Sequence, residues 1–265
     1  MIINWFKNKQ KSPAATTEVV EQYYETWTER YLDTGGDVIQ AVRTTHIEDL
    51  LDYFMQGSDL QPGEKILDAG CGVCGPAIHF AKKMPLAIHG VTISQKQVTI
   101  AKEKIEHAGL QDMISVIKGD YHKLEAYFSP NFFDKVLFLE SLGHAVAPDQ
   151  VLKSTFKVLK PGGYLYIKDF YTKESDDPNE QKRILEVVAN INRLYAYNTL
   201  DLHLIISTLR RIGFEIIFIK KPEFQDDTTI RALFEERFNI NIFGKYEAFA
   251  PSDWLEIKCR KPEWL

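Results

Sequence analysis

Apolar residues recur along this chain at two different spacings. Within residues 18–32 they fall at every third or fourth position, which predicts an amphipathic helix that ends at the glycine pair Gly35-Gly36. A second helix is predicted over residues 39–54. From residue 65 onward, short apolar runs of strand length alternate with helical stretches, and turn residues stand at the junctions.

This alternation predicts a parallel, doubly wound α/β sheet, because each strand is followed by a helix that can cross back over the sheet. The predicted strands cover residues 65–69, 87–91, 114–118, 134–139 and 164–170, with helices at 76–83, 95–108 and 150–159. Two further helices, at 179–195 and 200–212, precede two closing strands at 214–220 and 254–260. An aromatic-rich insert, residues 222–250, separates the closing strands.

The length of 265 residues fits one α/β domain better than two independent folds. Most of residues 1–17 are Lys, Gln, Ser, Pro, Ala, Thr or Asn, so we expect a flexible leader and a single domain over residues 18–265. Residues 18–60 are expected to form an N-terminal helical cap. We expect the 222–250 insert to form a lid over the substrate or to mediate contact in a homo-oligomer, because exposed aromatic surface favours association.

Charge and cysteine content narrow the range of partners. The formal net charge of −5 argues against a nucleic-acid-binding protein, which needs a clustered basic excess. No apolar run approaches the roughly 20 residues that cross a bilayer, so we expect no membrane span. Three cysteines in a chain of this length suit a reducing compartment, which predicts a cytoplasmic protein.

The segment 66–75 contains three glycines at the spacing Gly70-x-Gly72-x-x-Gly75, where small residues let a ligand approach the backbone at a helix N-terminus. A nicotinamide-binding fold would place an acid about 20 residues later, but residues 91–94 carry none. Asp68 precedes the glycines instead. A carboxylate at this turn attracts an ammonium group and repels a diphosphate.

The stretch from Leu67 to Gly72 resembles the first motif of class I S-adenosylmethionine-dependent methyltransferases. The resemblance implies a Rossmann-like, seven-stranded sheet that is mostly parallel, with an antiparallel last strand. It also implies S-adenosylmethionine as methyl donor and S-adenosylhomocysteine as product. The implied cofactor-binding residues of this loop are Asp68, Gly70, Cys71 and Gly72.

Cys74 stands where relatives of that family often carry glycine, and a small cysteine is expected to fit there. The pair Cys71 and Cys74 also has the spacing C-x-x-C. A zinc site needs two more ligands, however, and redox pairs usually open a helix in a thioredoxin-like fold. We therefore predict no metal site.

A second similarity follows the second predicted strand. Thr92 and Gln97 occupy the positions that hold the cofactor ribose in cyclopropane fatty-acid synthases and their relatives. The alternative is that Thr92 or Ser94 caps the helix that follows. Both can hold at once, with one residue capping the helix and the other binding the ribose.

Two more stretches extend the resemblance over roughly residues 20–170. Asp120 and Tyr121, after the third predicted strand, resemble the family element that binds adenine. An Asp after a Gly is also a common turn residue. Tyr24 and Thr28 belong to a stretch similar to the opening of sterol C-methyltransferases, which lies over the cofactor.

Glu140 and His144 follow the fourth predicted strand in a Glu-Ser-Leu-Gly-His-Ala stretch that matches the sterol enzymes. An alkene that takes up a methyl group becomes a carbocation, so its pocket needs aromatic faces and a base. Glu140 is the predicted base and a predicted cofactor contact, since strand ends face the ligand crevice. His144 assists it or only bonds a loop carbonyl. The candidate aromatic wall is Tyr24, Trp27, Tyr31, Phe170, Tyr171, Tyr195 and Tyr197.

The leading hypothesis is methyl transfer to a carbon of a hydrophobic, isoprenoid-like small molecule, as in sterol and prenyl-diphosphate C-methyltransferases. A prenyl diphosphate would require a basic, Mg²⁺-assisted site, and the sequence shows no obvious cluster of Arg and Lys for it. The alternatives are methyl transfer to N or O of a small metabolite, cyclopropane formation, and a non-catalytic nucleotide-binding module.

Overall fold

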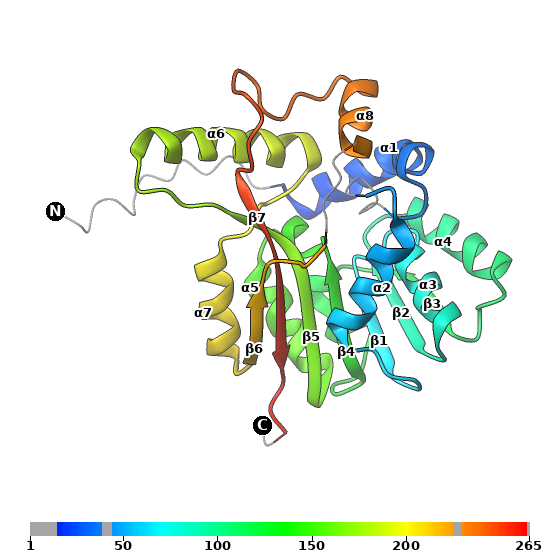
Figure 1. Ribbon diagram of the computed structural model, residues 1–265. Helices are drawn as coiled ribbons and strands as arrows, with labels where there is room; N and C mark the ends of the chain where they lie inside the picture. The colour runs from blue at the N-terminus through cyan, green and yellow to red at the C-terminus, as the bar shows by residue number, and fades with distance from the viewer. Residues whose placement is uncertain (1–14, 39–43, 225–228, 264–265) are drawn as a thin grey trace.

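The computed structural model describes residues 15–38, 44–224 and 229–263. It contains a seven-stranded sheet in the order β3-β2-β1-β4-β5-β7-β6 (Figure 1). The strands are β1 (Lys65–Ala69), β2 (Ala87–Thr92), β3 (Ile114–Lys118), β4 (Phe133–Leu139), β5 (Leu159–Thr172), β6 (Glu215–Lys220) and β7 (Ser252–Arg260). Strands β1 to β5 run parallel, and β7 is antiparallel to both β5 and β6. The predicted Rossmann-like fold with an antiparallel last strand is therefore confirmed.

The chain changes direction across the sheet between β1 and β4. From β1 it builds outward to β2 and β3, and it then returns to add β4 and β5 on the other side of β1. In open α/β sheets, ligands bind outside the carboxyl ends of the strands at such a switch point. The glycine loop follows β1 and Glu140 follows β4, so the topology brings both to this point.

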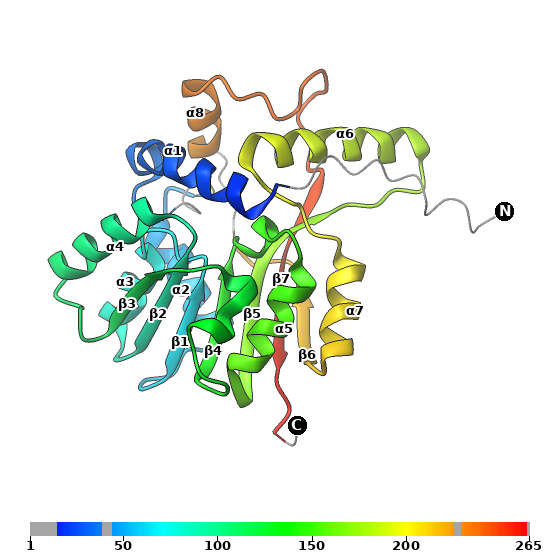
Figure 2. The same ribbon diagram turned by 180° about the vertical axis from the view of Figure 1, so that it is seen from behind.

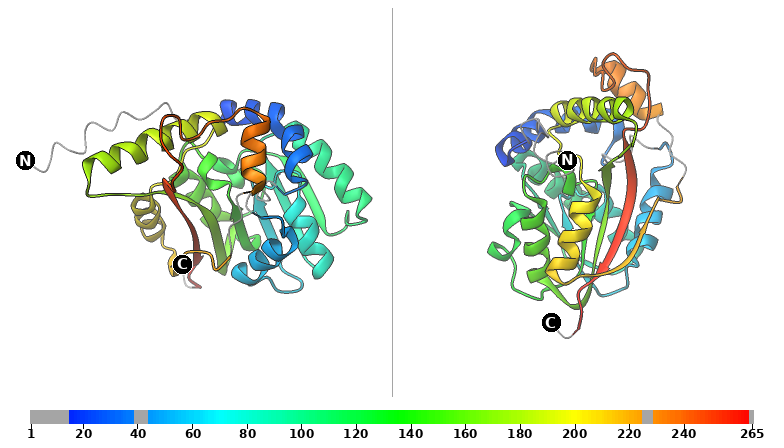
Figure 3. Two further views of the ribbon diagram at one scale, coloured as in Figure 1. Left: turned by 45° about the horizontal axis from the view of Figure 1, so that its top comes forward. Right: turned by 90° about the vertical axis from the view of Figure 1, so that its left-hand side faces the viewer.

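Helices cover both faces of the sheet, as the side view in Figure 3 shows. One face carries α2 (Ile47–Ser58), α3 (Gly75–Lys83) and α4 (Gln95–His107). The other carries the 3-10 turn η3 (Tyr121–Ala126), α5 (Pro148–Val158) and α7 (Leu202–Ile212). Each face has its own apolar core, so the sheet is buried on both sides as parallel sheets require.

Three helices lie across the carboxyl edge of the strands, at the top of Figures 1 and 2. They are α1 (Thr17–Gly35), α6 (Pro178–Tyr195) and α8 (Thr229–Arg237). α1 is capped by the Thr16 hydroxyl, which accepts a hydrogen bond from the Val19 nitrogen at 3.3 Å. Residues 1–14 of the predicted leader and residues 225–228 of the predicted lid lie outside the described residues. No helix in the described ranges has both the length and the apolar character needed to cross a membrane.

The second predicted helix begins later than expected. Residues 39–43 lie outside the described residues, and residues 44–46 are not helical, so α2 begins at Ile47. The reason is local, because the Thr44 hydroxyl accepts a hydrogen bond from the His46 nitrogen at 3.0 Å. Such side-chain bonds hold the backbone in a turn and compete with helix formation.

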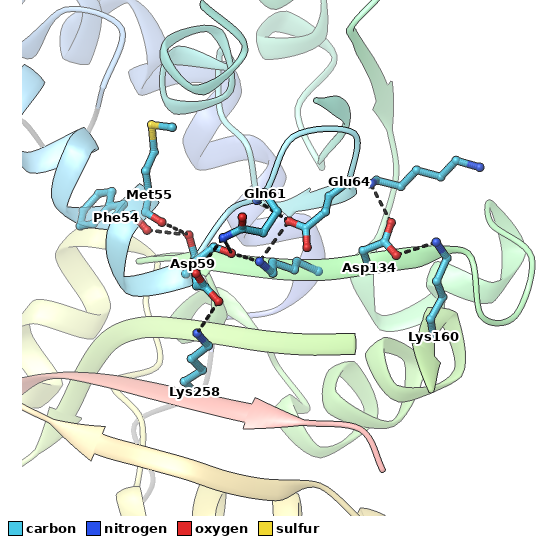
Figure 4. Close-up of polar contacts among 11 residues, drawn as sticks. Phe54, Met55, Asp59, Gln61, Glu64, Asp134, Lys160 and Lys258 are labelled. Carbon is cyan, nitrogen blue, oxygen red and sulfur yellow. Dashed lines mark hydrogen bonds and ion pairs between the residues drawn. The ribbon is translucent and has the colours of Figure 1, made fainter. Parts of the chain in front are cut away.

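Buried charges stabilise the opposite edge of the sheet, where the parallel strands begin (Figure 4). Lys135 on β4 is only 2% exposed. Its ammonium lies 3.0 Å from Glu64 Oε2 and donates to the Asp59 backbone oxygen. Lys258 Nζ lies 3.8 Å from the Asp59 carboxylate. A lysine this deeply buried needs such acceptors, because removing an ammonium from water is unfavourable.

Glu64→Gln is expected to lower the free energy of unfolding by about 1–3 kcal/mol, because Lys135 then stays buried without its counter-ion. Lys135→Met, which removes the buried charge itself, is expected to be better tolerated. Urea unfolding followed by circular dichroism measures both variants. The opposite order of stability would contradict the assignment of Glu64 as the counter-ion.

Candidate active site

A cavity of about 760 Å³ lies at the carboxyl edge of the strands, beneath α1, α6 and α8. Nine of the predicted site residues line it: Tyr24, Gly70, Gly72, Thr92, Gln97, Asp120, Tyr121, Glu140 and His144. Asp68 and Cys71 instead line a small adjoining cavity of about 30 Å³, which shares Gly70, Gly72 and Leu139 with the larger one. Residues from distant parts of the sequence therefore meet around one space.

The glycine loop packs tightly against the loop that follows β4. Gly70 has a φ of +86°, and a Cβ atom at this position would lie 2.4 Å from Ser141 Cβ. The Ser141 hydroxyl donates to the Ala69 backbone oxygen at 2.5 Å and so ties the two loops together. Cys74 has a φ of +64°, a left-handed conformation that favours glycine, so it carries backbone strain at the start of α3.

Asp68 is a buried acid that lacks a local partner. Its side chain is 3% exposed, and Oδ2 has no hydrogen-bond partner among the described residues. Burial raises the pKa of this carboxyl to about 7. An ammonium group at this place would relieve both the missing hydrogen bond and the desolvation of the carboxylate. The residue therefore fits the amino group of a methionine-containing cofactor.

Thr92 and Gln97 both face the cavity and bond to each other. The Thr92 hydroxyl donates to Gln97 Oε1 at 2.5 Å. The cap of α4 is Ser94, whose hydroxyl accepts from the Gln97 nitrogen at 3.1 Å. Of the two residues considered as caps, Ser94 takes that role and Thr92 is left at the cavity wall. The pair thus presents polar groups at the cavity wall that are able to hold ribose hydroxyls.

Asp120 is held as an ionised acceptor at the cavity wall. Burial acts to raise the pKa of its carboxyl, but hydrogen bonds from the His122 backbone and ring keep the pKa below its ordinary value. The His122 backbone nitrogen lies 2.9 Å and its ring Nδ1 2.6 Å from Asp120 Oδ1. The neighbouring Tyr121 hydroxyl donates to the Ser141 backbone oxygen at 2.9 Å, which fixes the ring. Sequence patterns did not single out His122 or Ser141.

Glu140 follows β4 with a strained backbone, at a φ of +57°. Its Oε1 atom lies 2.5 Å from Lys168 Nζ and accepts from Trp254 Nε1 at 2.8 Å. Lys168 is fully buried, and its ammonium lies 3.5 Å from the Trp254 ring centroid. These two donors stabilise the carboxylate form of Glu140. Sequence reasoning missed Lys168, whose only signal is a lysine inside the apolar strand predicted over residues 164–170.

Tyr24 and His144 form a hydrogen-bonded pair in the cavity wall. His144 Nδ1 lies 2.9 Å from the Ala196 backbone oxygen and must donate to it. Nε2 therefore accepts from the Tyr24 hydroxyl, which lies at 2.8 Å. Burial lowers the pKa of His144 to about 4 and raises that of Tyr24 well above its ordinary value. At neutral pH the pair is an uncharged phenol bonded to an uncharged imidazole.

This buried histidine predicts acid sensitivity. Between pH 6.5 and about 4 the unfolded chain binds a proton at His144 that the folded protein does not. His144 is therefore expected to contribute a loss of stability of up to about 3 kcal/mol as the pH drops through this window, while the raised pKa values of Asp68 and Asp169 act in the opposite direction. Urea unfolding should show that the stability of His144→Asn, measured relative to the wild type, is higher at pH 4 than at pH 7. His203→Asn, at an exposed histidine, should keep the wild-type profile.

A second hydrogen-bonded pair, Asp169 and Tyr197, holds the loop between Glu140 and His144 in place. Asp169 Oδ2 accepts from the Gly143 nitrogen at 3.0 Å, and the Tyr197 hydroxyl donates to Oδ1 of the same carboxylate. Tyr197 also packs edge-on against His144, with ring centroids 4.6 Å apart. This contact leaves no room for a side chain at Gly143, where a Cβ atom would meet the Tyr197 ring at 2.1 Å.

Thr28 and part of the predicted aromatic wall do not line the cavity. The hydroxyl of Thr28, a predicted cofactor contact, donates to the Tyr24 backbone oxygen at 2.5 Å. Trp27 stacks on Tyr23 and packs against Phe234 and Phe238, and Tyr171 is buried in the core. The cavity is lined by the remaining candidates and by three aromatic residues of the insert: Tyr24, Tyr31, Phe170, Tyr195, Tyr197, Phe234, Phe243 and Phe249.

Comparison with known proteins agrees with this geometry. The chain is 35% identical over 161 residues to 24-methylenesterol C-methyltransferase 3 of Arabidopsis thaliana, which covers 60% of this chain and 44% of that relative. The chain thus spans less than half the length of this curated relative. The solved [4+2]-cyclase SpnF matches with a TM-score of 0.73 at 22% identity, over 94% of this chain and 98% of that one.

A second solved structure is the geranyl diphosphate C-methyltransferase of Streptomyces coelicolor A3(2), bound to Mg²⁺, geranyl diphosphate and S-adenosylhomocysteine. It matches with a TM-score of 0.66 at 14% identity, over 81% of this chain and 79% of that one. A family model for a methyltransferase domain matches residues 60–212, which is more than half of this chain. The protein therefore belongs to the methyltransferase domain family, which confirms the S-adenosylmethionine-dependent family expected from its sequence.

Proposed function

We propose that this protein transfers a methyl group from S-adenosylmethionine to a carbon of a hydrophobic, isoprenoid-like or other alkene-bearing small molecule. The observation that carries the proposal is Glu140, a carboxylate at the switch point that lines a cavity with largely apolar and aromatic walls. The name of the Arabidopsis relative, a sterol C-methyltransferase, supports the same chemistry.

The cofactor half of the cavity and the small adjoining cavity together have a suitable group for each part of S-adenosylmethionine. Asp68 would bind the ammonium, Thr92 and Gln97 the ribose, and Asp120 the adenine amino group. The closely packed Gly70 lets the chain pass beside the ligand without a side chain in the way. When bound, the cofactor supplies an electrophilic methyl group.

The other residues would stabilise the positive charge that forms on the acceptor and would remove a proton from it. A double bond that shares its electron pair with a methyl carbon leaves a positive charge on the acceptor, which the Glu140 carboxylate and the faces of nearby aromatic rings stabilise. Glu140 then takes the proton from the adjacent carbon, and those C–H electrons form the new double bond. Glu140 is paired with Lys168, and a C–H bond next to a carbocation is so acidic that a weak base suffices.

One observation favours a second candidate, methyl transfer to oxygen or nitrogen. In that reaction the nucleophile must lose a proton, and Tyr24 could take it while passing its own proton to His144 Nε2. The neutral pair has the hydrogen-bond direction that this relay needs. It would have no such task in the methylation of an alkene.

An assay with a trideuteromethyl-labelled donor separates these reactions. Purified protein is incubated with alkene, phenol and amine panels, and products are analysed by mass spectrometry and NMR. C-methylation predicts a new carbon–carbon bond that retains three deuterium atoms, whereas cyclopropane formation retains two. Products methylated only on oxygen or nitrogen would overturn the carbon assignment. A product without deuterium would indicate a cofactor-independent reaction on this fold.

A further inference from the structure

The inner face of α8 closes the cavity from above with one aromatic and two charged residues. Arg231, Phe234 and Glu235 all line the cavity. Phe234 is buried and stacks on Tyr31 of α1, with ring centroids 4.9 Å apart. This contact holds α8 against α1, and Figure 1 shows both helices at the carboxyl edge of the sheet. The two charged side chains, one turn apart, are therefore held at the roof of the acceptor space.

Arg231 and Glu235 have hydrogen-bonding capacity that the described residues do not use. Arg231 Nε and Glu235 Oε1 are 3.6 Å apart, beyond a good hydrogen bond. Both atoms are buried and have no hydrogen-bond partner in the described ranges. The Tyr195 hydroxyl interacts with the same carboxylate, and burial raises the pKa of Glu235. Two buried polar atoms of opposite character, which belong to residues of the cavity wall, thus lack a hydrogen-bond partner among the described residues.

We call the part of the cavity that is lined by α8 and the start of β7 the acceptor half. Its other cations already lie beside a carboxylate. Lys173 Nζ and Lys221 Nζ lie 4.0 and 3.2 Å from the same Asp253 oxygen. Within the described wall, Arg231 is the remaining cation of this half, and Glu235 lies beside it. A diphosphate would need several cations free of such partners. This distribution of charge favours a neutral acceptor over an anionic one.

We propose that Arg231 and Glu235 form a subsite for one hydroxyl group, so that the acceptor is a neutral amphipathic alcohol. A guanidinium can only donate hydrogen bonds and a carboxylate can only accept them. A ligand that satisfies both within 3.6 Å must donate and accept at a single atom, which a hydroxyl oxygen does. This inference rests on the proposed function, since it takes the acceptor to lie between Glu140 and α8.

Equilibrium binding tests the subsite without requiring turnover. Dissociation constants are measured by titration calorimetry in the presence of S-adenosylhomocysteine. The probes are farnesol, farnesyl methyl ether and farnesyl diphosphate, with an unsaturated sterol and its methyl ether as a second matched pair. The variants are Glu235→Gln and Arg231→Met. The control is Glu236→Gln on the exposed side of α8.

The wild type and Glu236→Gln are expected to bind at least one alcohol at least about tenfold more tightly than its methyl ether, and farnesyl diphosphate no better than farnesol. Both subsite variants should lose this preference while keeping the affinity for S-adenosylhomocysteine. Equal affinity for alcohol and ether in both pairs, as when a water fills the gap, would overturn the proposal. So would tightest binding of the diphosphate. If the alcohols bind selectively but are never methylated, the proposed function fails and the subsite stands.

Discussion

Glu140→Gln is expected to reduce methyl transfer to an alkene acceptor by about 10²–10⁴-fold, with little change in cofactor affinity. The amide keeps the size of the side chain, but it carries no negative charge and cannot take up the proton. The measurement is single-turnover transfer from labelled S-adenosylmethionine, with the acceptor identified by the panel. S-adenosylhomocysteine binding is measured in parallel by calorimetry.

A double variant separates the chemical role of Glu140 from its structural one. In Glu140→Gln alone, Lys168 stays fully buried without its carboxylate, so a loss of stability is expected. Glu140→Gln/Lys168→Met removes both charges and should recover much of that stability while transfer stays low. If the double variant regained alkene methylation along with stability, Glu140 would be a structural residue and not the base.

Much of the sheet could be predicted because its signals are local. β1 and β3 coincide with the predicted strands, and β2 and β4 differ by one residue. The buried faces of these strands come from consecutive apolar residues, and glycine or proline marks their ends. The same local patterns placed Asp68 and Glu140 near the carboxyl ends of two strands, and the structure shows that these strands, β1 and β4, are neighbours.

Contacts between distant residues could not be predicted in this way. Tyr24 and His144 are 120 positions apart, and Lys168 is 28 positions from Glu140. No spacing rule connects them, because the path of the chain across the sheet decides which side chains meet. The predicted start of the second helix was wrong for a different reason, because the Thr44 hydroxyl accepts a hydrogen bond from the His46 nitrogen and residues 44–46 are not helical.

The family match includes most residues of the cofactor half of the cavity but leaves out much of the acceptor half. The family match ends at residue 212, so it includes the glycine loop, Thr92, Asp120 and Glu140. α1, α8 and the start of β7 lie outside it, although they supply much of the acceptor wall. The [4+2]-cyclase with a similar fold shows that this architecture also supports other chemistry. The identity of the acceptor therefore depends on the residues of α1, α8 and β7 that close the cavity.

Asp68→Asn is expected to weaken S-adenosylhomocysteine binding by about 10²-fold near pH 7.5, because a buried carboxylate–ammonium pair is lost. Asp176→Asn, at an exposed acid, removes the same charge and should bind normally. Loss of binding should not reflect unfolding. The raised pKa of Asp68 means that the ligand-free protein loses stability as the pH rises toward about 7, so the asparagine variant should be at least as stable at pH 8.

The pH dependence of this binding is the sharper test of Asp68. Below pH 7 the carboxyl must release its proton before it can pair with the ligand, so the wild-type affinity should fall by up to about tenfold per pH unit. At a pH high enough to deprotonate the ligand's own amino group, affinity should fall again. Calorimetry in buffers of different ionisation enthalpy should detect proton release at pH 6.5 in the wild type and none in Asp68→Asn. An unchanged acid limb in the variant would assign that proton to another group and remove Asp68 from the ammonium site.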